Sequence, residues 1–482
     1  MSRAGFFEKR PEIVFAAAVL AASLVFICFF FSNQGYWWDE AVYLGLAKNL
    51  YEGKGYYINA NQESFRPPLF PYAIFFLWKV FGQSEFAVRI MPPLFGVLSI
   101  IATHAFAKKL YGKEVAGWAA LMLATTHMFL FFGLKLLTET VFMFLFALSL
   151  CLLYLGVERN RKLLPLAGIA MALTFLTRYM GYVLPVVYAA YPLIKILATK
   201  KSKGRTAFKQ IFFDKFYWAG ALLFLAVLAP WLWMSYVNFG SLLGALLAES
   251  STVTTGWYVD GWTYYFAHWI EIFGLVGLFA VPAAVYMIFK IRDCKNEFTL
   301  LSVAAIIVFF ALLPRKEMRY MISFLPIFAV FFAAGAAELG KWLRKETLVG
   351  VLIVIFCAIN LVAGIQMIEY DMQGGYALKQ AGLYLKDIAP ADAKIMTQNM
   401  PVLFYTAGRQ IVYFPESEAE LANVITKNNV RFIVIEKREP TYPSYVWIEQ
   451  DSDKLPSRVF DRFKLEKTFQ EKNETFVWVY RV

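Results

Sequence analysis

Two adjacent carboxylates, Asp39 and Glu40, directly follow a tryptophan pair and the first long apolar run of the chain. Tryptophan favours the headgroup level of a bilayer, so Trp37 and Trp38 would hold these acids at the lipid–water boundary. A carboxylate placed there can act as a general base toward a substrate that is itself partly lipid. The alternative is structural: Asp39 would cap an amphipathic helix expected at 39–51, with Glu40 in its first turn.

Basic side chains flank other apolar runs. Arg66 precedes two prolines that stiffen the backbone, which gives the cation a rigid mount. Arg178 ends an apolar run, and ionisable groups at membrane depth are usually functional or paired. One short segment adds three more cations and a tyrosine, namely Arg315, Lys316, Arg319 and Tyr320. Arginine binds phosphate in bidentate fashion, so phosphate is the ligand that these cations suit. Anchoring to lipid headgroups is the alternative.

Glu139 opens a further apolar run directly after Thr138 and could supply a second carboxylate. It could equally cap the start of a helix, with Lys135 available to pair with it within one turn. The stretch 238–268 adds three weaker candidates, Glu249, Asp260 and His268. A single histidine beside Trp269 is more typical of an interfacial residue than of a metal ligand.

Apolar helices must position these residues. The chain has 482 residues, of which 59% are hydrophobic and 17% charged, the balance of a polytopic membrane protein. The first apolar run, 13–31, exceeds a signal-peptide core and lacks a small-residue cleavage site, so we expect a retained helix. Spanning-length runs recur to about residue 368 and predict about eleven transmembrane helices. Four cysteines and three histidines show no metal-type spacing, so neither disulfides nor a zinc site is expected.

Basic clusters alternate with the apolar runs, which predicts the topology. They lie near residues 3–10, 108–113, 159–162, 200–209, 290–295 and 341–345. The positive-inside rule then puts the N-terminus in the cytoplasm of a multi-pass cell-membrane protein. The loop 33–85 and the segment 369–482 would be external, and 315–320 breaks the rule with three external cations. Because the positive charge lies in short loops rather than on a soluble face, a nucleic-acid partner is not expected.

Two domains are expected. Residues 1–368 would form the transmembrane domain, and its external loop 33–85 contains an apolar piece at 69–80 that is too short to cross and would lie at the interface. Residues 369–482 would form an accessory α/β domain. Its expected helices and strands cover 376–388, 394–397, 410–414, 416–428, 430–436 and 475–481. This domain contains no glycine-rich phosphate loop and no nucleophile elbow.

The pattern resembles the GT-C glycosyltransferases of the protein O-mannosyltransferase and lipid A aminoarabinose transferase type. The resemblance covers the membrane region to about residue 340, and the order of the motifs and their predicted side of the membrane make it specific. The matching elements are Asp39-Glu40 after the first span, Arg66-Pro67-Pro68, Thr138-Glu139, Leu176-Thr177-Arg178, and Arg319-Tyr320 before Leu325-Pro326.

The resemblance implies an inverting transfer of a monosaccharide from a dolichyl or undecaprenyl phosphate to an acceptor hydroxyl outside the membrane. It implies that Asp39 is the catalytic base, accompanied by Glu40 and by Glu139, where relatives usually have aspartate. Arg66 and Arg319 would contact the lipid phosphate, joined by Arg178, Arg315, Lys316 and Tyr320. The acceptor could be a protein, a lipid or a glycan. The resemblance implies no definite cofactor: some relatives need no metal, and the sequence does not support a divalent-metal site here.

Two other functions fit a polytopic chain. A transporter or flippase would need polar residues or broken helices near the midplane, often with an internal repeat. The ionisable groups gather instead at the ends of the apolar runs. An oligosaccharyltransferase would use a pyrophosphate lipid and a divalent metal.

Overall fold

The computed structural model describes residues 11–31, 35–58, 65–198, 213–254, 261–313, 316–372, 374–406, 408–437, 443–446, 460, 462–471 and 474–482. The chain forms two compact units. The first comprises Met1–Cys28, Phe65–Phe70 and Arg89–Ile368, and the second comprises Phe29–Ser64, Pro71–Val88 and Glu369–Val482. Much of the predicted loop 33–85 is therefore grouped with the C-terminal segment.

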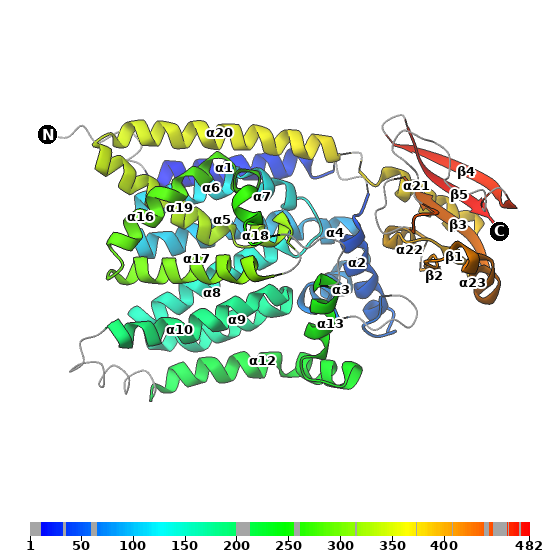
Figure 1. The fold of residues 1–482 in the computed structure, drawn as a ribbon, viewed down its shortest axis with the longest axis horizontal. Coiled ribbons are helices and arrows are strands. Elements are labelled where there is room, and N and C mark those ends of the chain that lie inside the picture. The colour runs from blue at the N-terminus through cyan, green and yellow to red at the C-terminus, as the bar shows by residue number, and fades with distance from the viewer. Residues whose placement is uncertain are drawn as a thin grey trace. The chain divides into compact units, whose positions relative to one another are not determined.

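The first unit is a helical bundle (Figure 1). Its elements are α1 (Pro11–Phe29), α5 (Met91–Tyr111), α6 (Lys113–Thr125), α7 (His127–Phe132), α8 (Glu139–Glu158), η1 (Arg161–Leu163), α9 (Leu164–Thr177), η2 (Tyr179–Tyr182), α10 (Val183–Ala198), α12 (Lys215–Phe239), α13 (Gly244–Thr254), α14 (Tyr264–Ala267), α15 (Trp269–Phe273), η3 (Leu275–Phe279), α16 (Ala280–Phe289), α17 (Cys294–Leu312), α18 (Met318–Ile322), α19 (Leu325–Leu343) and α20 (Glu346–Asp371).

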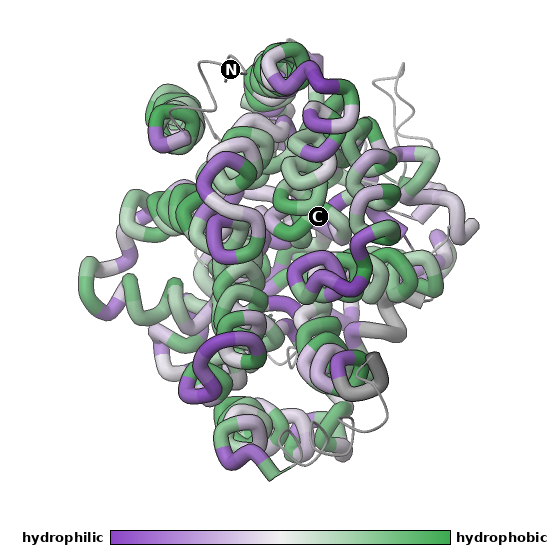
Figure 2. The backbone as a smooth tube through the Cα atoms, turned by 90° about the vertical axis from the view of Figure 1, so that its left-hand side faces the viewer, coloured by the Kyte–Doolittle hydropathy of each residue, from purple (hydrophilic) through white to green (hydrophobic). Residues whose placement is uncertain are grey.

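Seven helices within the described residues are long and apolar enough to span a bilayer. They include α1, α8, α12, α17 and α19, a stretch from Glu85 to Tyr111, and one that begins with α20. Figure 2 looks along the bundle and shows largely hydrophobic helices, with hydrophilic residues in several turns nearest the viewer. The multi-pass character is confirmed, whereas the number eleven stays a prediction.

Helix α8 lies at the centre of this unit. It packs against α5 and α9, and α9 packs in turn against α12. Gly168 on α9 and Gly220 on α12 permit a close approach, because a Cβ at Gly168 would lie 2.0 Å from the Gly220 carbonyl oxygen. Small residues allow membrane helices to come together in this way. Around α8 the core is aromatic, with Phe146 and Phe324 ring centroids 4.9 Å apart.

A glutamate at each end of α8 binds side chains from neighbouring elements. Glu158, the last residue, accepts a hydrogen bond from Tyr191 Oη at 2.6 Å and pairs with Lys195, both on α10. Glu139, the first residue, lies about 30 Å away along the helix axis. Its partners form the candidate site.

The second unit combines helices of the early loop with the C-terminal segment. Its elements are α2 (Trp38–Tyr51), most of α3 (Leu69–Phe81), α4 (Glu85–Arg89), α21 (Tyr376–Ile388), β1 (Lys394–Met396), α22 (Met400–Tyr405), β2 (Ile411–Val412), η4 (Glu418–Glu420), α23 (Leu421–Asn428), β3 (Val430–Glu436), β4 (Lys464–Glu471) and β5 (Glu474–Arg481).

Five strands of this unit form one sheet in the order β2-β1-β3-β5-β4 (Figure 1). The strands β2, β1 and β3 are parallel, and β5 is antiparallel to both β3 and β4. Helix α21 and the strands β1, β3 and β5 appear where the sequence predicts them. The sequence did not predict α22 or β4, because α22 has only six residues and the edge strand β4 is largely polar and exposed.

Candidate functional site

One buried carboxylate organises the candidate site in the first unit. Glu139 begins α8, Arg178 is the C-terminal cap of α9, and Arg319 lies on α18, which leads into α19. Since α8 packs against both α9 and α19, the start of α8, the end of α9 and the start of α19 come together at one end of the bundle. The fold therefore brings together three of the site residues that the sequence predicts.

The contacts within this triad are short and direct. Arg178 Nη1 lies 2.5 Å from Glu139 Oε1 and donates to Thr138 Oγ1 at 3.1 Å. Arg319 Nε donates to the same Glu139 oxygen. The Glu139 side chain is 0% exposed, whereas those of Arg178 and Arg319 are 11% and 21% exposed. The carboxylate is thus enclosed, and the cations are the members that reach the surface.

The charge of the triad suits an anionic ligand. Two guanidinium groups share one carboxylate, which leaves one net positive charge. A guanidinium carries five N–H donors in a fixed fork, so the Glu139 contacts orient each arginine while using few of its donors. Phosphate oxygens are ligands that such oriented arginines bind well. The triad can therefore act as a preformed cradle for a phosphate.

Arg66 is connected to the triad through Tyr179, which directly follows Arg178. The Tyr179 hydroxyl donates to the Phe65 carbonyl, and Trp231 Nε1 donates to that hydroxyl at 3.2 Å. Tyr179 and Trp231 are both buried, so this link lies inside the helix packing. It holds the rigid segment that carries Arg66 beside the end of α9.

The side chain of Arg66 meets an acid from α13. Arg66 Nη1 lies 3.3 Å from Glu249 Oε1, and the two side chains are 19% and 24% exposed. The N-terminus of α13 is attached to α12, because the Ala245 amide donates to Ser235 Oγ at 3.0 Å. The predicted phosphate ligand Arg66 therefore has a carboxylate partner in this structure.

The remaining predicted cations lie around the connection from α17 to α18. Lys316 is buried and donates from Nζ to the Leu313 carbonyl at 2.6 Å, at the C-terminal end of α17. Tyr320 is buried on α18, with its ring centroid 6.3 Å from that of Phe310. Arg315 falls outside the described residues. Lys316 and Tyr320 thus have structural contacts close to Arg319.

Asp39 and Glu40 belong to the second unit, in the first turn of α2. The prediction that Asp39 caps this helix is wrong, because α2 begins at Trp38 and its cap position is Trp37. Glu40 is fully buried and accepts a hydrogen bond from the Trp37 amide nitrogen at 2.6 Å, so it supports the helix start, as considered from the sequence. Asp39 is partly exposed at the second helical position.

Three contributors were not assigned to the site from the sequence. Glu249 was one of several acids in a long loop, and no local pattern pairs it with Arg66. Tyr179 and Trp231 fall in apolar context, and only the position of Tyr179 directly after Arg178 pointed to it. Of the weaker candidates, His268 Nδ1 lies 2.9 Å from the Tyr264 carbonyl oxygen, and Asp260 is outside the described residues. Lys135 is buried with its Nζ 5.2 Å from the Phe131 ring.

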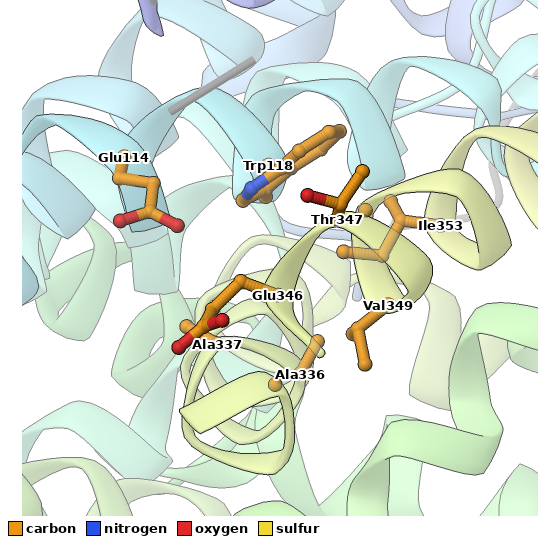
Figure 3. A pocket seen from close by; sticks show the side chains of 10 residues that line it. Glu114, Trp118, Ala336, Ala337, Glu346, Thr347, Val349 and Ile353 are labelled. Atoms are coloured by element: carbon orange, nitrogen blue, oxygen red, sulfur yellow. The ribbon is translucent and has the colours of Figure 1, made fainter. Parts of the chain in front are cut away.

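A small cavity lies elsewhere in the first unit. Figure 3 shows it among α6, α19 and α20, with Glu114 and Glu346 near Trp118. Its volume of about 30 Å³ accommodates roughly one water molecule, so it is too small for a sugar. Within the described part of the chain, no three His, Cys, Asp or Glu side chains gather as a metal-binding group.

Comparisons with known proteins relate this architecture to membrane glycosyltransferases. Residues 65–234 match the sequence model of the family described as dolichyl-phosphate-mannose-protein mannosyltransferase. This stretch contains Arg66, Glu139 and Arg178. An uncharacterised protein of Aquifex aeolicus is 26% identical over 316 residues, which are 63% of this chain and 61% of that protein's length. The match therefore spans about three fifths of that relative.

Two solved structures share the fold over most of the chain. ArnT from Cupriavidus metallidurans bound to undecaprenyl phosphate has a TM-score of 0.69 and 13% identity over 97% of both chains. The Archaeoglobus fulgidus oligosaccharyltransferase in the apo form has a TM-score of 0.67 and 13% identity over 89% of this chain and 70% of its own. The chain thus shares the fold of these two membrane proteins, which confirms the GT-C fold class expected from the sequence.

The buried triad makes a prediction about stability. Glu139→Gln removes the anion between two partly buried cations, a change that typically costs about 3–5 kcal/mol. We expect the apparent melting temperature of the purified protein in detergent to fall by several degrees. The control is Glu12→Gln. Glu12 also forms an ion pair, with Lys113 at 3.0 Å, but both side chains of that pair are exposed. Equal melting temperatures for the two variants would contradict the role given to Glu139.

Proposed function

We propose that this chain is an inverting glycosyltransferase that moves a monosaccharide from a polyprenyl phosphate to an acceptor hydroxyl. The observation that carries this proposal is the arginine pair held by buried Glu139 at one end of a GT-C bundle. The match of residues 65–234 to the mannosyltransferase family supports it. So do the structures of the same fold with bound lipid phosphates, undecaprenyl phosphate in ArnT and dolichol-phosphate in the archaeal AglB.

The reaction would take place on the extracytoplasmic face of the cell membrane. The basic clusters of the sequence favour a cytoplasmic N-terminus. In that orientation the start of α8 and the end of α9 face outward, and so does the segment 369–482. A donor lipid would then have its prenyl tail in the bilayer and its sugar phosphate at the outer leaflet. The acceptor is a hydroxyl of a protein, a lipid or a glycan.

Asp39 is the residue that we assign as general base. It takes the proton of the acceptor hydroxyl as that oxygen attacks C1 of the donor sugar. The bond between C1 and the phosphate oxygen breaks on the opposite face, so the anomeric configuration inverts. The polyprenyl phosphate leaves as an anion with the bonding electron pair, and the proton remains on Asp39. Because the leaving group is already anionic, the step needs no acid to protonate it.

Charge builds on the departing phosphate, and the arginines would stabilise it. Arg178 and Arg319 are oriented for this task by Glu139, so we assign Glu139 a positioning role instead of proton transfer. Glu40 has a similar supporting role at the start of α2. Lys316 and Tyr320 support the α17–α18 connection. We also assign Arg315 as a phosphate contact, on the basis of the sequence pattern alone.

Arg66 already has an anionic partner near the position where it would bind the phosphate. In this structure its partner is the Glu249 carboxylate at 3.3 Å. Phosphate binding at Arg66 would be opposed by that carboxylate, because the two anions repel each other beside the same guanidinium. Glu249 would thus hold Arg66 in place before the donor binds.

Replacement of the assigned base tests the proposed reaction. Asp39→Asn should lower the transfer rate by about 10²–10⁴-fold, the usual contribution of a general base. The assay measures transfer of label from a panel of polyprenyl-phosphate monosaccharides by the protein in membranes. Glu52→Gln is the control, since Glu52 lies just after the same helix and pairs with Lys54 at 2.6 Å. Near-normal transfer by the Asp39 variant would refute the assigned mechanism.

Replacing the two members of the Arg66–Glu249 pair should have opposite effects on lipid binding. Arg66→Ala should weaken the binding of undecaprenyl phosphate, because a phosphate contact is lost. Glu249→Gln should strengthen binding several-fold, because the neutral amide does not repel the phosphate anion. Titration of the lipid by microscale thermophoresis in detergent measures both. Weaker binding by the Glu249 variant would show that this acid is required for the site and does not oppose phosphate binding.

A further inference from the structure

The C-terminal domain packs against the helix that carries Asp39. Both belong to the second unit, and within it α2 packs against α22. Helix α22 also packs against α21, which in turn lies on strands β4 and β5. These contacts therefore connect α2, through two helices, to the sheet.

Tyr405, at the end of α22, makes the central contact. Its hydroxyl accepts a hydrogen bond from the Tyr36 amide at 3.0 Å, and this bond is buried. The two tyrosine rings stack with centroids 5.5 Å apart and planes within 15°. The side chains of Tyr36 and Tyr405 are 2% and 7% exposed. Such a contact between segments 369 residues apart fixes a specific arrangement.

Two glycine contacts show how closely these segments fit. A Cβ at Gly35 would lie 2.4 Å from the carbonyl carbon and oxygen of Gly375, so only glycine permits this approach. Tyr405 itself lies close to α21, because a Cβ at Gly382 would lie 2.5 Å from the Tyr405 Cβ. Tyr405 is thus held between α21 and the segment that leads into α2.

The other end of α2 approaches the same domain. A Cβ at Gly408 would lie 3.3 Å from Lys48 Nζ. Burial lowers the pKa of the Lys48 ammonium. The Glu52 carboxylate opposes this shift, and the positive charges of Lys54, Lys386 and Arg409 add to it. Helix α2 therefore meets the C-terminal domain at both ends.

The two consecutive backbone amides directly before α2 donate to side chains from different parts of the chain. The Trp37 amide donates to Glu40 within the helix itself, and the Tyr36 amide donates to Tyr405 of the C-terminal domain. An amide without an acceptor in a buried position is costly, so both bonds fix the path of the chain into the helix. Asp39 follows Tyr36 by only three residues, so the same contacts set its orientation.

We infer that Tyr405 is a positioning residue for Asp39, and that the C-terminal domain serves the reaction by holding the start of α2. This inference rests on the proposed function for its kinetic consequence. Its structural part, that Tyr405 holds the segment 35–40, stands independently. The domain thereby has a role in the transfer step itself, beyond any selection of the acceptor.

Tyr405→Phe removes the acceptor hydroxyl and keeps the aromatic stack. We expect kcat to fall about three- to tenfold, as for the loss of one buried hydrogen bond, with the KM for the polyprenyl-phosphate donor unchanged. Tyr445→Phe is the matched control, because its hydroxyl donates to the Pro415 carbonyl at 2.6 Å in the same domain. A loss of kcat shared equally by both variants would assign the effect to domain stability and overturn the inference.

Hydrogen–deuterium exchange of the full chain in detergent tests the structural part without any substrate. Peptides covering residues 36–44 should exchange faster in Tyr405→Phe and remain unchanged in Tyr445→Phe. Gly35→Ala should have the same effect as Tyr405→Phe, whereas Gly45→Ala should not, since a Cβ there has its nearest neighbour at 3.8 Å. Unchanged exchange in both Tyr405→Phe and Gly35→Ala would overturn the inference. Absent transfer by the unaltered chain would refute only the proposed function.

Discussion

The carboxylate of Glu139, enclosed between Arg178 and Arg319, is the interaction on which the candidate site depends. Burial of a carboxylate costs several kcal/mol, and close cationic partners must offset that cost. The three residues come from the start of α8, the end of α9 and α18, so one ion network fixes the relative positions of three elements. A chain that needed only stability could use apolar side chains there. Under the proposed function, the cations of this network bind the lipid phosphate.

The aromatic packing around α9 extends this arrangement to Arg66. Tyr179 accepts from Trp231 and donates to the Phe65 carbonyl, so the rigid proline segment is attached beside Arg178. The close approach of α9 and α12 at Gly168 and Gly220 brings Trp231 into reach. Phosphate binding would thus rely on helix packing for its geometry. In the second unit, Glu40 and Tyr405 serve Asp39 in the same manner.

Much of this organisation could be predicted from the sequence, and the reasons differ between elements. Arginines at the ends of apolar runs are costly to place in a membrane protein, so Arg178 and Arg319 were identifiable without any contact information. Helix α21 and strand β3 have strong periodicity and were predicted correctly. The alternative in which Asp39 caps α2 was wrong. Trp37 takes the cap position, and Glu40, three residues later, accepts the hydrogen bond from its amide. The pairs Arg66–Glu249 and Tyr36–Tyr405 join distant segments, and no local pattern reports them.

The most direct test of the central claim compares two lipids that differ only in the phosphate. Undecaprenyl phosphate should raise the melting temperature of the protein in detergent, whereas undecaprenol should not. Arg319→Ala should reduce that stabilisation strongly, and Arg292→Ala, which removes an exposed arginine at another loop, should leave it intact. Equal stabilisation by the alcohol and the phosphate, or full stabilisation of the Arg319 variant, would show that the arginines held by Glu139 do not bind the lipid phosphate.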